Sequence, residues 1–180
     1  MSDQPFTGTI VCSLVFLRRL GEVLLARKVK ELIIGYLTGH GGKQELGETI
    51  RQTAVRELFD ETGKGVIVKP EKLHRRAVIY FHNRNKDGTR FIIKVHVYVA
   101  WWWEGEPKAT DEMAEPSWFP DGNLPFEQMP PGDRYWLPQI MADKDVEIIG
   151  HIHYSRNQKR LIKKDIRRMY GLLDKLEPES

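Results

Sequence analysis

The segment from Gly42 to Gly63 constrains the fold of this chain more than any other, because it places a glycine loop directly before a well-delimited helix. Thr49 with Gln52 three residues later is a capping-box signature, which starts a helix. Gly63 supplies the left-handed residue that commonly ends one. The sequence therefore predicts a helix between Thr49 and Gly63.

The predicted helix carries an acidic face and an apolar face. Glu57, Asp60 and Glu61 stand at positions i, i+3 and i+4, so their side chains converge. An apolar face for burial is formed by Ala54, Val55, Leu58 and Phe59. The three carboxylates repel one another unless a cation lies between them. Magnesium, with manganese as an alternative, suits such oxygen ligands better than zinc does. An acidic helix face can also be merely solvated, so the metal interpretation depends on the rest of the segment.

The whole segment follows a fixed spacing: Gly42, five residues, Glu48, seven residues, Arg56-Glu57-Leu58, one residue, Asp60-Glu61, one residue and Gly63. Chance would rarely produce this pattern in a chain of this length. The pattern resembles the Nudix box, so the chain resembles a Nudix hydrolase. The resemblance implies an α/β fold, the Nudix α/β/α sandwich with a mixed β-sheet. It also implies divalent-metal-dependent cleavage of a nucleoside diphosphate linked to another group.

The resemblance assigns metal ligands by position. Glu57, Asp60 and Glu61 correspond to the carboxylate ligands of the box, and Gly41 is expected to lend a backbone carbonyl. Asp60 departs from the family pattern, where glutamate is usual. Because its side chain is one methylene shorter, direct ligation by Asp60 is less secure than ligation by Glu57 or Glu61.

The remaining box residues have structural roles in the family. Gly42 is the box glycine, Glu48 and Arg56 are the pair that shapes the loop, and Gly63 closes the helix. Lys64 stands where an aliphatic residue is expected. We therefore expect the next strand to begin later in the chain.

A second segment, residues 111–138, resembles the animal MutT-like branch of the family, which hydrolyses oxidised purine nucleoside triphosphates such as 8-oxo-dGTP. With the box, the resemblance covers residues 39–138. By position, it implies substrate contacts from Thr38, Lys43, Met113, Asp133 and Trp136, with Met113 and Trp136 as apolar walls of the pocket.

The base-reading positions of that branch are altered in this chain. Thr38 replaces an asparagine, Pro130 replaces a tryptophan, and Gly132-Asp133 replaces a pair of aspartates. Two adjacent aspartates can share a proton, and a lone Asp133 loses that coupling. The altered base-reading positions therefore leave selectivity for an oxidised purine undecided by the sequence.

The charged residues of the box and of the neighbouring loop are expected to carry out catalysis. Glu57, Glu61 or Glu112 would accept a proton from the attacking water, and Lys43 or Arg56 would stabilise charge or structure. Glu112 matches the catalytic loop glutamate of the family by its Asp-Glu-Met triplet. One extra residue before Trp118 leaves Glu115 as an alternative candidate for this catalytic glutamate.

Composition agrees with a compact enzyme. The 180 residues fit one Nudix domain over 1–180, with a charged extension from about residue 156. A lone cysteine, Cys12, excludes an internal disulfide framework and favours a cytoplasmic location. The apolar run at residues 9–17 is too short to cross a membrane. The sequence does not decide between a monomer and a homodimer.

Residue alternation predicts the other elements. A short helix is expected at residues 133–141, and the tail is helix or strand. Strands are expected at residues 9–17, 22–27, 73–82, 89–101 and 146–154, with the third and fourth joined through a turn at Asp87-Gly88.

Three other features have a plain structural explanation beside a functional one. Trp101 to Trp103 could stack on a base, but alternate side chains of a strand end point to core and to solvent. His151 and His153 share a strand face, yet no third metal ligand is evident nearby. The basic tail, residues 156–168, could contact RNA or anionic lipid, although a solvated face is the simpler interpretation.

Three hypotheses about function follow. The first is a magnesium-dependent Nudix hydrolase that converts a nucleoside triphosphate, including an oxidised purine dNTP, to monophosphate and pyrophosphate, and so sanitises the nucleotide pool. The second is a Nudix pyrophosphatase for a nucleotide sugar, a dinucleoside polyphosphate or capped RNA. The third is a non-catalytic nucleotide-binding protein, against which the intact Arg56, Glu57 and Glu61 argue.

Overall fold

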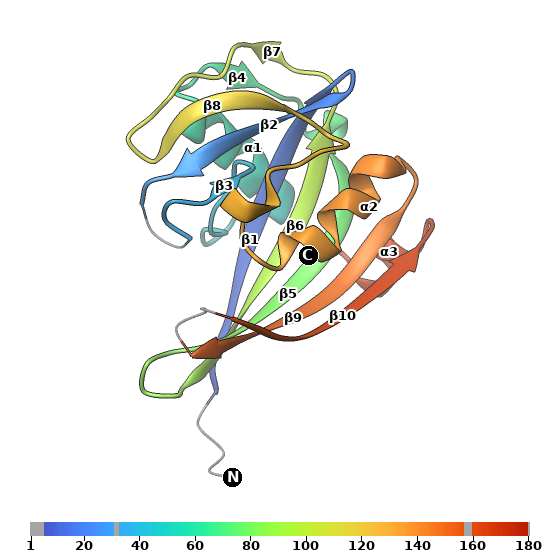
Figure 1. Cartoon of the computed structure of the whole chain (residues 1–180). Helices are drawn as coiled ribbons and strands as arrows, with labels where there is room; N and C mark the ends of the chain where they lie inside the picture. The colour runs from blue at the N-terminus through green and yellow to red at the C-terminus, as the bar shows by residue number, and fades with distance from the viewer. Residues whose placement is uncertain (1–5, 31–32, 157–159, 180) are drawn as a thin grey trace.

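The computed structural model describes residues 6–30, 33–156 and 160–179, and its main element is one mixed β-sheet (Figure 1). The sheet follows the order β10-β9-β5-β6-β1-β2-β3, and β8 pairs with β2. Its strands are β1 (Phe6–Arg19), β2 (Glu22–Lys28), β3 (Leu37–Thr38), β5 (His74–Arg84), β6 (Arg90–Ala100), β8 (Met113–Pro120), β9 (Glu147–Arg156) and β10 (Leu161–Met169). The pairs β1–β6 and β5–β9 are parallel, and the other pairs are antiparallel.

The remaining elements are short. A separate two-stranded sheet joins β4 (Val66–Ile67) to β7 (Glu104–Gly105). The helices are α1 (Ile50–Glu61), α2 (Leu137–Ala142) and α3 (Leu173–Leu176), with single 3₁₀ turns at Pro70–Lys72, Phe126–Gln128 and Asp133–Tyr135.

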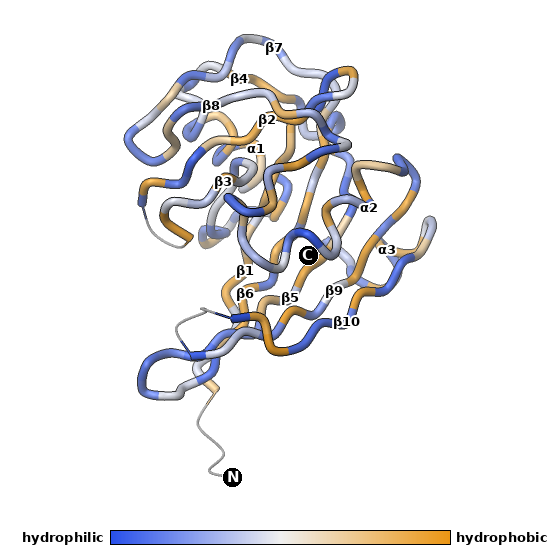
Figure 2. Tube along the Cα trace, in the orientation of Figure 1, coloured by the Kyte–Doolittle hydropathy of each residue, from blue (hydrophilic) through white to orange (hydrophobic). Residues whose placement is uncertain are grey.

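The helices lie on both faces of the sheet. The apolar side chains of α2 pack with one set of alternating strand residues, among them Phe16, Ile79 and Val97. The apolar side chains of α1 pack with the opposite set, which includes Val15 and Tyr98. On that second face α3 contributes Leu173 to a smaller cluster on β5. Apolar residues accordingly fill the centre of the strands while polar ones dominate the loops (Figure 2). The expected mixed sheet between helices is confirmed.

The predicted limits of α1 are confirmed as well. The Thr49 hydroxyl accepts a hydrogen bond from the Gln52 amide, and the Gln52 side chain accepts one from the Thr49 amide. Gly63 has φ +64°, the left-handed conformation expected of it. Lys64 also adopts a positive φ of 58°, and β4 begins only at Val66, which is the late start that Lys64 predicted.

The first part of the tail is a strand, and a short helix, α3, follows it. Residues 161–169 form β10 and pair antiparallel with β9, so the charged extension continues the sheet. Residues 157–159 of the predicted extension lie outside the described residues. The predicted helix at 133–141 is divided at Trp136 into a 3₁₀ turn and α2.

Residues 177–179 form a strap across the second sheet face. Glu177 accepts hydrogen bonds from Tyr80 (2.7 Å) and Lys94 (2.9 Å). Glu179 accepts hydrogen bonds from Arg51 in the first turn of α1 at 3.0 and 2.8 Å. These contacts tie the end of the chain to the sheet and to the acidic helix. Among the described residues, no helix is long and apolar enough to span a membrane.

Candidate active site

The glycine loop is held against β1 by backbone hydrogen bonds. The amide of Ser13 donates to the carbonyl of Gly42 (2.9 Å), and the amide of Val15 donates to the carbonyl of His40 (2.7 Å). A Cβ atom on Gly41 would overlap the carbonyl oxygen of Ser13, so a side chain cannot be accommodated there. The loop therefore takes its position from the central strand of the sheet.

Arg56 and Glu48 brace the loop from the side of α1. The Arg56 guanidinium donates to both oxygens of Glu48, at 2.6 and 3.0 Å, and to the carbonyl of Lys43 at 3.2 Å. Glu48 also accepts from the hydroxyl of Thr53 (2.8 Å). The hydrogen bonds from Arg56 lower the pKa of Glu48 to about 2. This is the loop-shaping contact that the box spacing predicts.

Glu57 lies directly under the loop. Its Oε1 accepts a hydrogen bond from Arg56 Nη1 at 2.7 Å. A Cβ atom on Gly42 would stand 2.5 Å from the Glu57 carboxyl carbon, so the bare glycine leaves the space that the carboxylate fills. Burial raises the pKa of Glu57 above its ordinary value, although Arg56 opposes the shift.

Glu61 is buried, with only 3 % of the residue exposed. One oxygen accepts a hydrogen bond from the Gly41 amide at 2.7 Å, and the other accepts one from the Lys28 ammonium. Lys28 lies 3.9 Å from a second carboxylate, Glu112. Burial raises the pKa of Glu61 to about 7, against the lowering effect of Lys28.

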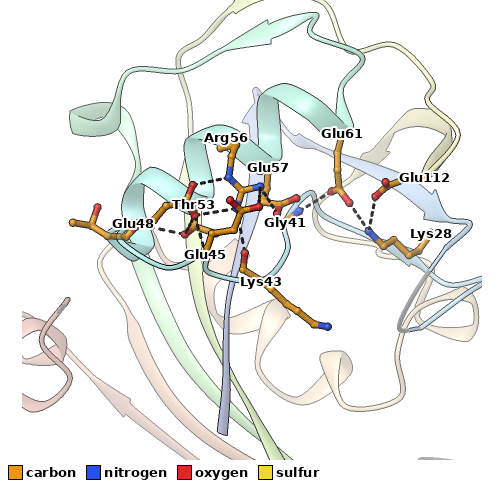
Figure 3. Close-up of polar contacts among 11 residues, drawn as sticks. Lys28, Gly41, Lys43, Glu45, Glu48, Thr53, Arg56, Glu57, Glu61 and Glu112 are labelled. Carbon is orange, nitrogen blue, oxygen red and sulfur yellow. Dashed lines mark hydrogen bonds and ion pairs between the residues drawn. The ribbon is translucent and has the colours of Figure 1, made fainter.

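These groups line an acidic cleft of about 680 Å³, shown in part in Figure 3. Asp60 lies at the exposed rim of the cleft, which agrees with its lower rank as a ligand. The Lys43 side chain points away from the carboxylates in Figure 3, and it lines the cleft together with a neighbouring cavity.

The donor set fits magnesium or manganese. Glu57 and Glu61 are held as carboxylates beside a loop with no side chains at Gly41 and Gly42. The buried Glu61 and the partly buried Glu57 have raised pKa values, so both gain from a nearby positive charge, which Lys28 supplies in this structure. A hard cation bound by oxygen atoms would neutralise the same charge.

A second cavity of about 330 Å³ adjoins the cleft across the glycine loop. Thr38 and Asp133 both line it, as the sequence predicts, and so does Ser13, whose buried hydroxyl has no hydrogen-bond partner among the described residues. Its apolar walls include Phe81 and Ile93. A mostly apolar cavity with a few polar groups is typical of a small-molecule site.

Asp133 is the most perturbed polar group of this cavity. Its carboxyl is buried, and Oδ1 accepts a hydrogen bond from the indole of Trp136 at 3.2 Å. Burial raises the pKa of Asp133 to about 7. A carboxyl that keeps its proton near neutral pH can donate a hydrogen bond as well as accept one.

The structure does not bring the two expected apolar walls, Met113 and Trp136, to the surface of either cavity. Trp136 is fully buried in the core behind Asp133, where it contacts Phe16, and Met113 is buried beside β2. Neither residue lines the two cavities described above. Sequence spacing does not show to which side of the backbone these side chains turn. In this structure the Trp136 indole donates a hydrogen bond to Asp133 and so holds a polar group of the cavity.

The structure distinguishes Glu112 from Glu115, the two candidates for the loop glutamate. Glu112 lines the acidic cleft, whereas Glu115 is strongly exposed on β8 and lies 3.8 Å from Arg27. Glu112 is therefore the loop carboxylate that the cleft presents.

Lys28 is a residue of the acidic cleft that no sequence motif indicates. It ends β2, and a lysine at a strand end gives no sign of burial against a helix 33 residues later. Neither cavity is lined by the tryptophans at 101–103. His40 is buried and does not line either cavity.

A mixed sheet here presents a glycine loop and helix carboxylates to an acidic cleft, an arrangement that suits a divalent metal ion and the phosphate groups it binds. The chain belongs to the Nudix family, because the NUDIX domain model matches residues 8–140. It is a Nudix hydrolase, and members of this family typically use a divalent metal ion.

Two curated relatives make the comparison more specific. The chain is 37 % identical over 150 residues to the "Oxidized purine nucleoside triphosphate hydrolase" of Danio rerio, covering 83 % of this chain and 89 % of that protein. It is 33 % identical over 143 residues to the protein of the same name from Mus musculus, covering 79 % and 85 %. The chain is thus related to hydrolases of oxidised purine nucleotides.

Solved structures share the fold. A MutT protein from Bacillus halodurans superposes with a TM-score of 0.71 at 21 % identity, covering 87 % of this chain and 97 % of that one. A MutT Nudix hydrolase from Burkholderia pseudomallei gives a TM-score of 0.57 at 23 % identity, covering 73 % and 98 %. At these identities the likeness shows the fold alone.

Proposed function

We propose that this protein hydrolyses purine nucleoside triphosphates, with oxidised purines such as 8-oxo-dGTP as the candidate substrates, to nucleoside monophosphate and pyrophosphate. The observation that carries the proposal is the lining that the two cavities share. The acidic cleft and the base-sized cavity share Lys28, Gly41, Gly42 and Lys43 as lining. One ligand could therefore place a base in the cavity and its phosphates in the cleft. Sanitising the cytoplasmic nucleotide pool is the cellular role this activity would serve.

The phosphate half of the site would be held by charge. Glu57 and Glu61, with Asp60 at the rim and the Gly41 carbonyl, would hold magnesium or manganese. The bound metal would neutralise phosphoryl oxygens and lower the pKa of water. Lys43 lines both cavities and can contact the phosphates between them.

The reaction needs one proton acceptor. A water oxygen forms a bond to a phosphorus of the α–β bridge, the bond from that phosphorus to the bridging oxygen breaks, and the water proton passes to a carboxylate. Glu57 and Glu61 accept hydrogen bonds from Arg56 and Lys28, whereas the half-exposed Glu112 carboxylate in the same cleft lies 3.9 Å from Lys28, beyond hydrogen-bond distance. We assign the proton to Glu112. We assign a structural role to Arg56, because its guanidinium hydrogen-bonds to Glu48, Glu57 and the Lys43 carbonyl and so holds the loop and Glu57.

The base half of the site supports a purine with altered hydrogen bonding. Oxidation at C8 converts N7 of a purine from an acceptor to an N–H donor. Asp133 offers an acceptor and a proton within one carboxyl, and the hydroxyl of Thr38 offers both functions as well. Polar groups placed to bond a substrate discriminate more strongly than apolar contact does. The names of the two curated relatives point to the same substrate class.

No observation favours the capped-RNA alternative over this one. The basic residues of β10 lie at the far edge of the sheet, and the described part of that strand does not line either cavity.

A substrate panel with magnesium tests the proposal. We expect pyrophosphate release from 8-oxo-dGTP at a kcat/KM above that for dGTP, and slower turnover of nucleotide sugars, dinucleoside polyphosphates and capped RNA. Equal turnover of oxidised and plain dGTP would remove the oxidised-base preference. A Glu57→Gln variant that folds normally and keeps full turnover would contradict the assignment of the acidic cleft as the catalytic metal site.

A matched pair of variants tests the proton acceptor. Glu112→Gln is expected to lower kcat by roughly 10²- to 10⁴-fold with little change in KM. Glu115→Gln, three residues away and outside the cleft, is expected to leave kcat unchanged. Equal effects in the two variants would contradict the assignment.

A further inference from the structure

Three histidines meet on the second face of the sheet, beyond the part that α1 and α3 cover. His82 lies on β5, and His151 and His153 lie on β9. The parallel register places His82 opposite His153 and Tyr80 opposite His151, so all four side chains share one face. Figure 1 shows this end of β5 and β9 extending past the helices. The third imidazole that sequence spacing could not supply comes from the neighbouring strand.

The imidazoles are close enough to share a ligand. His82 Nε2 lies 3.0 Å from His151 Nδ1, so one nitrogen donates a hydrogen bond to the other. The His82 and His153 rings are stacked with centroids 4.1 Å apart and an interplanar angle of 9°. Two nitrogen atoms bound tetrahedrally to one zinc ion at about 2.1 Å lie about 3.4 Å apart. The His82–His151 pair therefore needs only a small widening to hold a metal ion.

Surrounding groups fix the position of this pair. Tyr80 stacks on His151 with centroids 4.7 Å apart and an angle of 6°, and its hydroxyl donates to Glu177 of the strap. On β10, Asp165 is opposite His151 and Lys163 is opposite His153. Asp165 is thus a carboxylate directly across from the pair.

The surroundings of His82 and His153 lower the pKa of both imidazoles. Burial and the two neighbouring histidines lower the pKa of His82 to about 4. Burial, Lys163 and His151 lower the pKa of His153. The charged groups that face the cluster are Lys163 and Asp165 from β10 and, beside Tyr80, Lys94 of β6, which is paired with Glu177. A neutral imidazole has the free lone pair that a metal ion binds.

We propose that His82, His151 and His153 form a second metal site, one for a divalent transition-metal ion that prefers imidazole, such as Zn²⁺, and distinct from the carboxylate cleft. Among the described residues no three metal-binding side chains already converge on one point. His82 and His151 supply the first two ligands once the hydrogen bond between them opens, and rotation of the partly exposed His153 ring out of its stack supplies the third. Asp165 or water completes the coordination. The ion would join β5 to β9 at the end of the sheet that the helices leave open.

Zinc titration in the presence of millimolar Mg²⁺ tests the site, since Mg²⁺ competes for oxygen ligands and not for imidazoles. We expect the wild-type protein and the Glu57→Gln variant to bind one Zn²⁺ alike by calorimetry. We expect His82→Asn and His151→Asn to weaken binding by roughly tenfold or more. His74→Asn is the matched control, because His74 is an exposed histidine on the same strand, and it should bind as the wild type does. Circular dichroism checks that each variant is folded.

A measurement on the unaltered protein complements the variants. In ¹H–¹⁵N spectra of the imidazole rings, Zn²⁺ is expected to shift signals of the cluster histidines and to leave those of His74 in place. Equal Zn²⁺ affinity in His82→Asn, His151→Asn and the wild type, or Zn²⁺ binding that disappears in Glu57→Gln, would overturn the proposal. Both outcomes would identify the cluster as an aromatic stack without a metal, and neither depends on the nucleotide substrate.

Discussion

Replacing Asp133 by asparagine should change how the stability of this protein depends on pH. The carboxyl is buried, with the Trp136 indole as its hydrogen-bond donor, and burial raises its pKa from 3.8 to about 7. Between these two values the folded protein holds a proton that the unfolded chain has released. Folding is therefore favoured at the acidic end of the window, and this contribution is lost as pH rises from about 4 to about 7.

The magnitude follows from the size of the shift. Each pH unit in the window costs about 1.4 kcal/mol, so the full loss approaches about 4 kcal/mol as an upper value. Asparagine has the same shape and cannot ionise, and the variant escapes this loss. The free energy of unfolding of Asp133→Asn, relative to the wild type, should increase with pH across the window and become constant above it.

Urea unfolding followed by tryptophan fluorescence at pH 5, 6, 7 and 8, without added metal, measures this difference. Other acidic groups titrate alike in both proteins and cancel in the comparison. Asp145→Asn, at an exposed carboxyl near α2, is the control and should give a curve parallel to the wild type. A parallel curve for Asp133→Asn would refute the reasoning, because it would mean that Asp133 is ionised in the folded protein throughout the range.

Three further predictions concern the acidic cleft. Lys28→Met leaves Glu61 buried without its cation, which should lower the free energy of unfolding by about 3–5 kcal/mol in metal-free buffer. Mg²⁺ should then add more stability to the variant than to the wild type. Equal Mg²⁺ effects on the two proteins in urea unfolding would contradict this prediction. Gly41→Ala introduces a Cβ into β1 and should abolish turnover in the phosphate-release assay, while a variant that keeps wild-type kcat would show that the loop tolerates displacement. Glu48→Gln removes a carboxylate whose pKa Arg56 lowers to about 2, so the stability that the wild type loses between about pH 4 and pH 2 should not be lost by the variant, as acid titration by circular dichroism would show.

Local signals predicted the acidic helix closely. Thr49 and Gln52 cap each other, Gly63 takes the left-handed conformation, and β4 starts late after Lys64. These features depend on residues within one turn of each other, so a sequence pattern contains them completely.

Features that join distant segments could not be predicted in the same way. Lys28 meets Glu61 and His82 meets His151 only because the sheet places their elements side by side. The direction of the Trp136 side chain depends on how α2 packs, so a position in a motif did not distinguish a pocket wall from a buried support. The tail was undecided because β10 is an edge strand with charges on both faces, which removes the alternation that identifies a strand.

The parallel pairing of β1 with β6 also determines when the site can form during folding. Leu17 pairs with Ala100, and the intervening chain, roughly 80 residues, includes α1. An isolated helix as short as α1 is marginal in water, and its buried Leu58 packs against Tyr98 and its neighbours on β6. The acidic helix therefore gains its stability only after the chain has closed this long loop. We expect refolding to be slow, and we expect substitutions at the β1–β6 pair to retard it more than changes in helix propensity on the exposed side of α1.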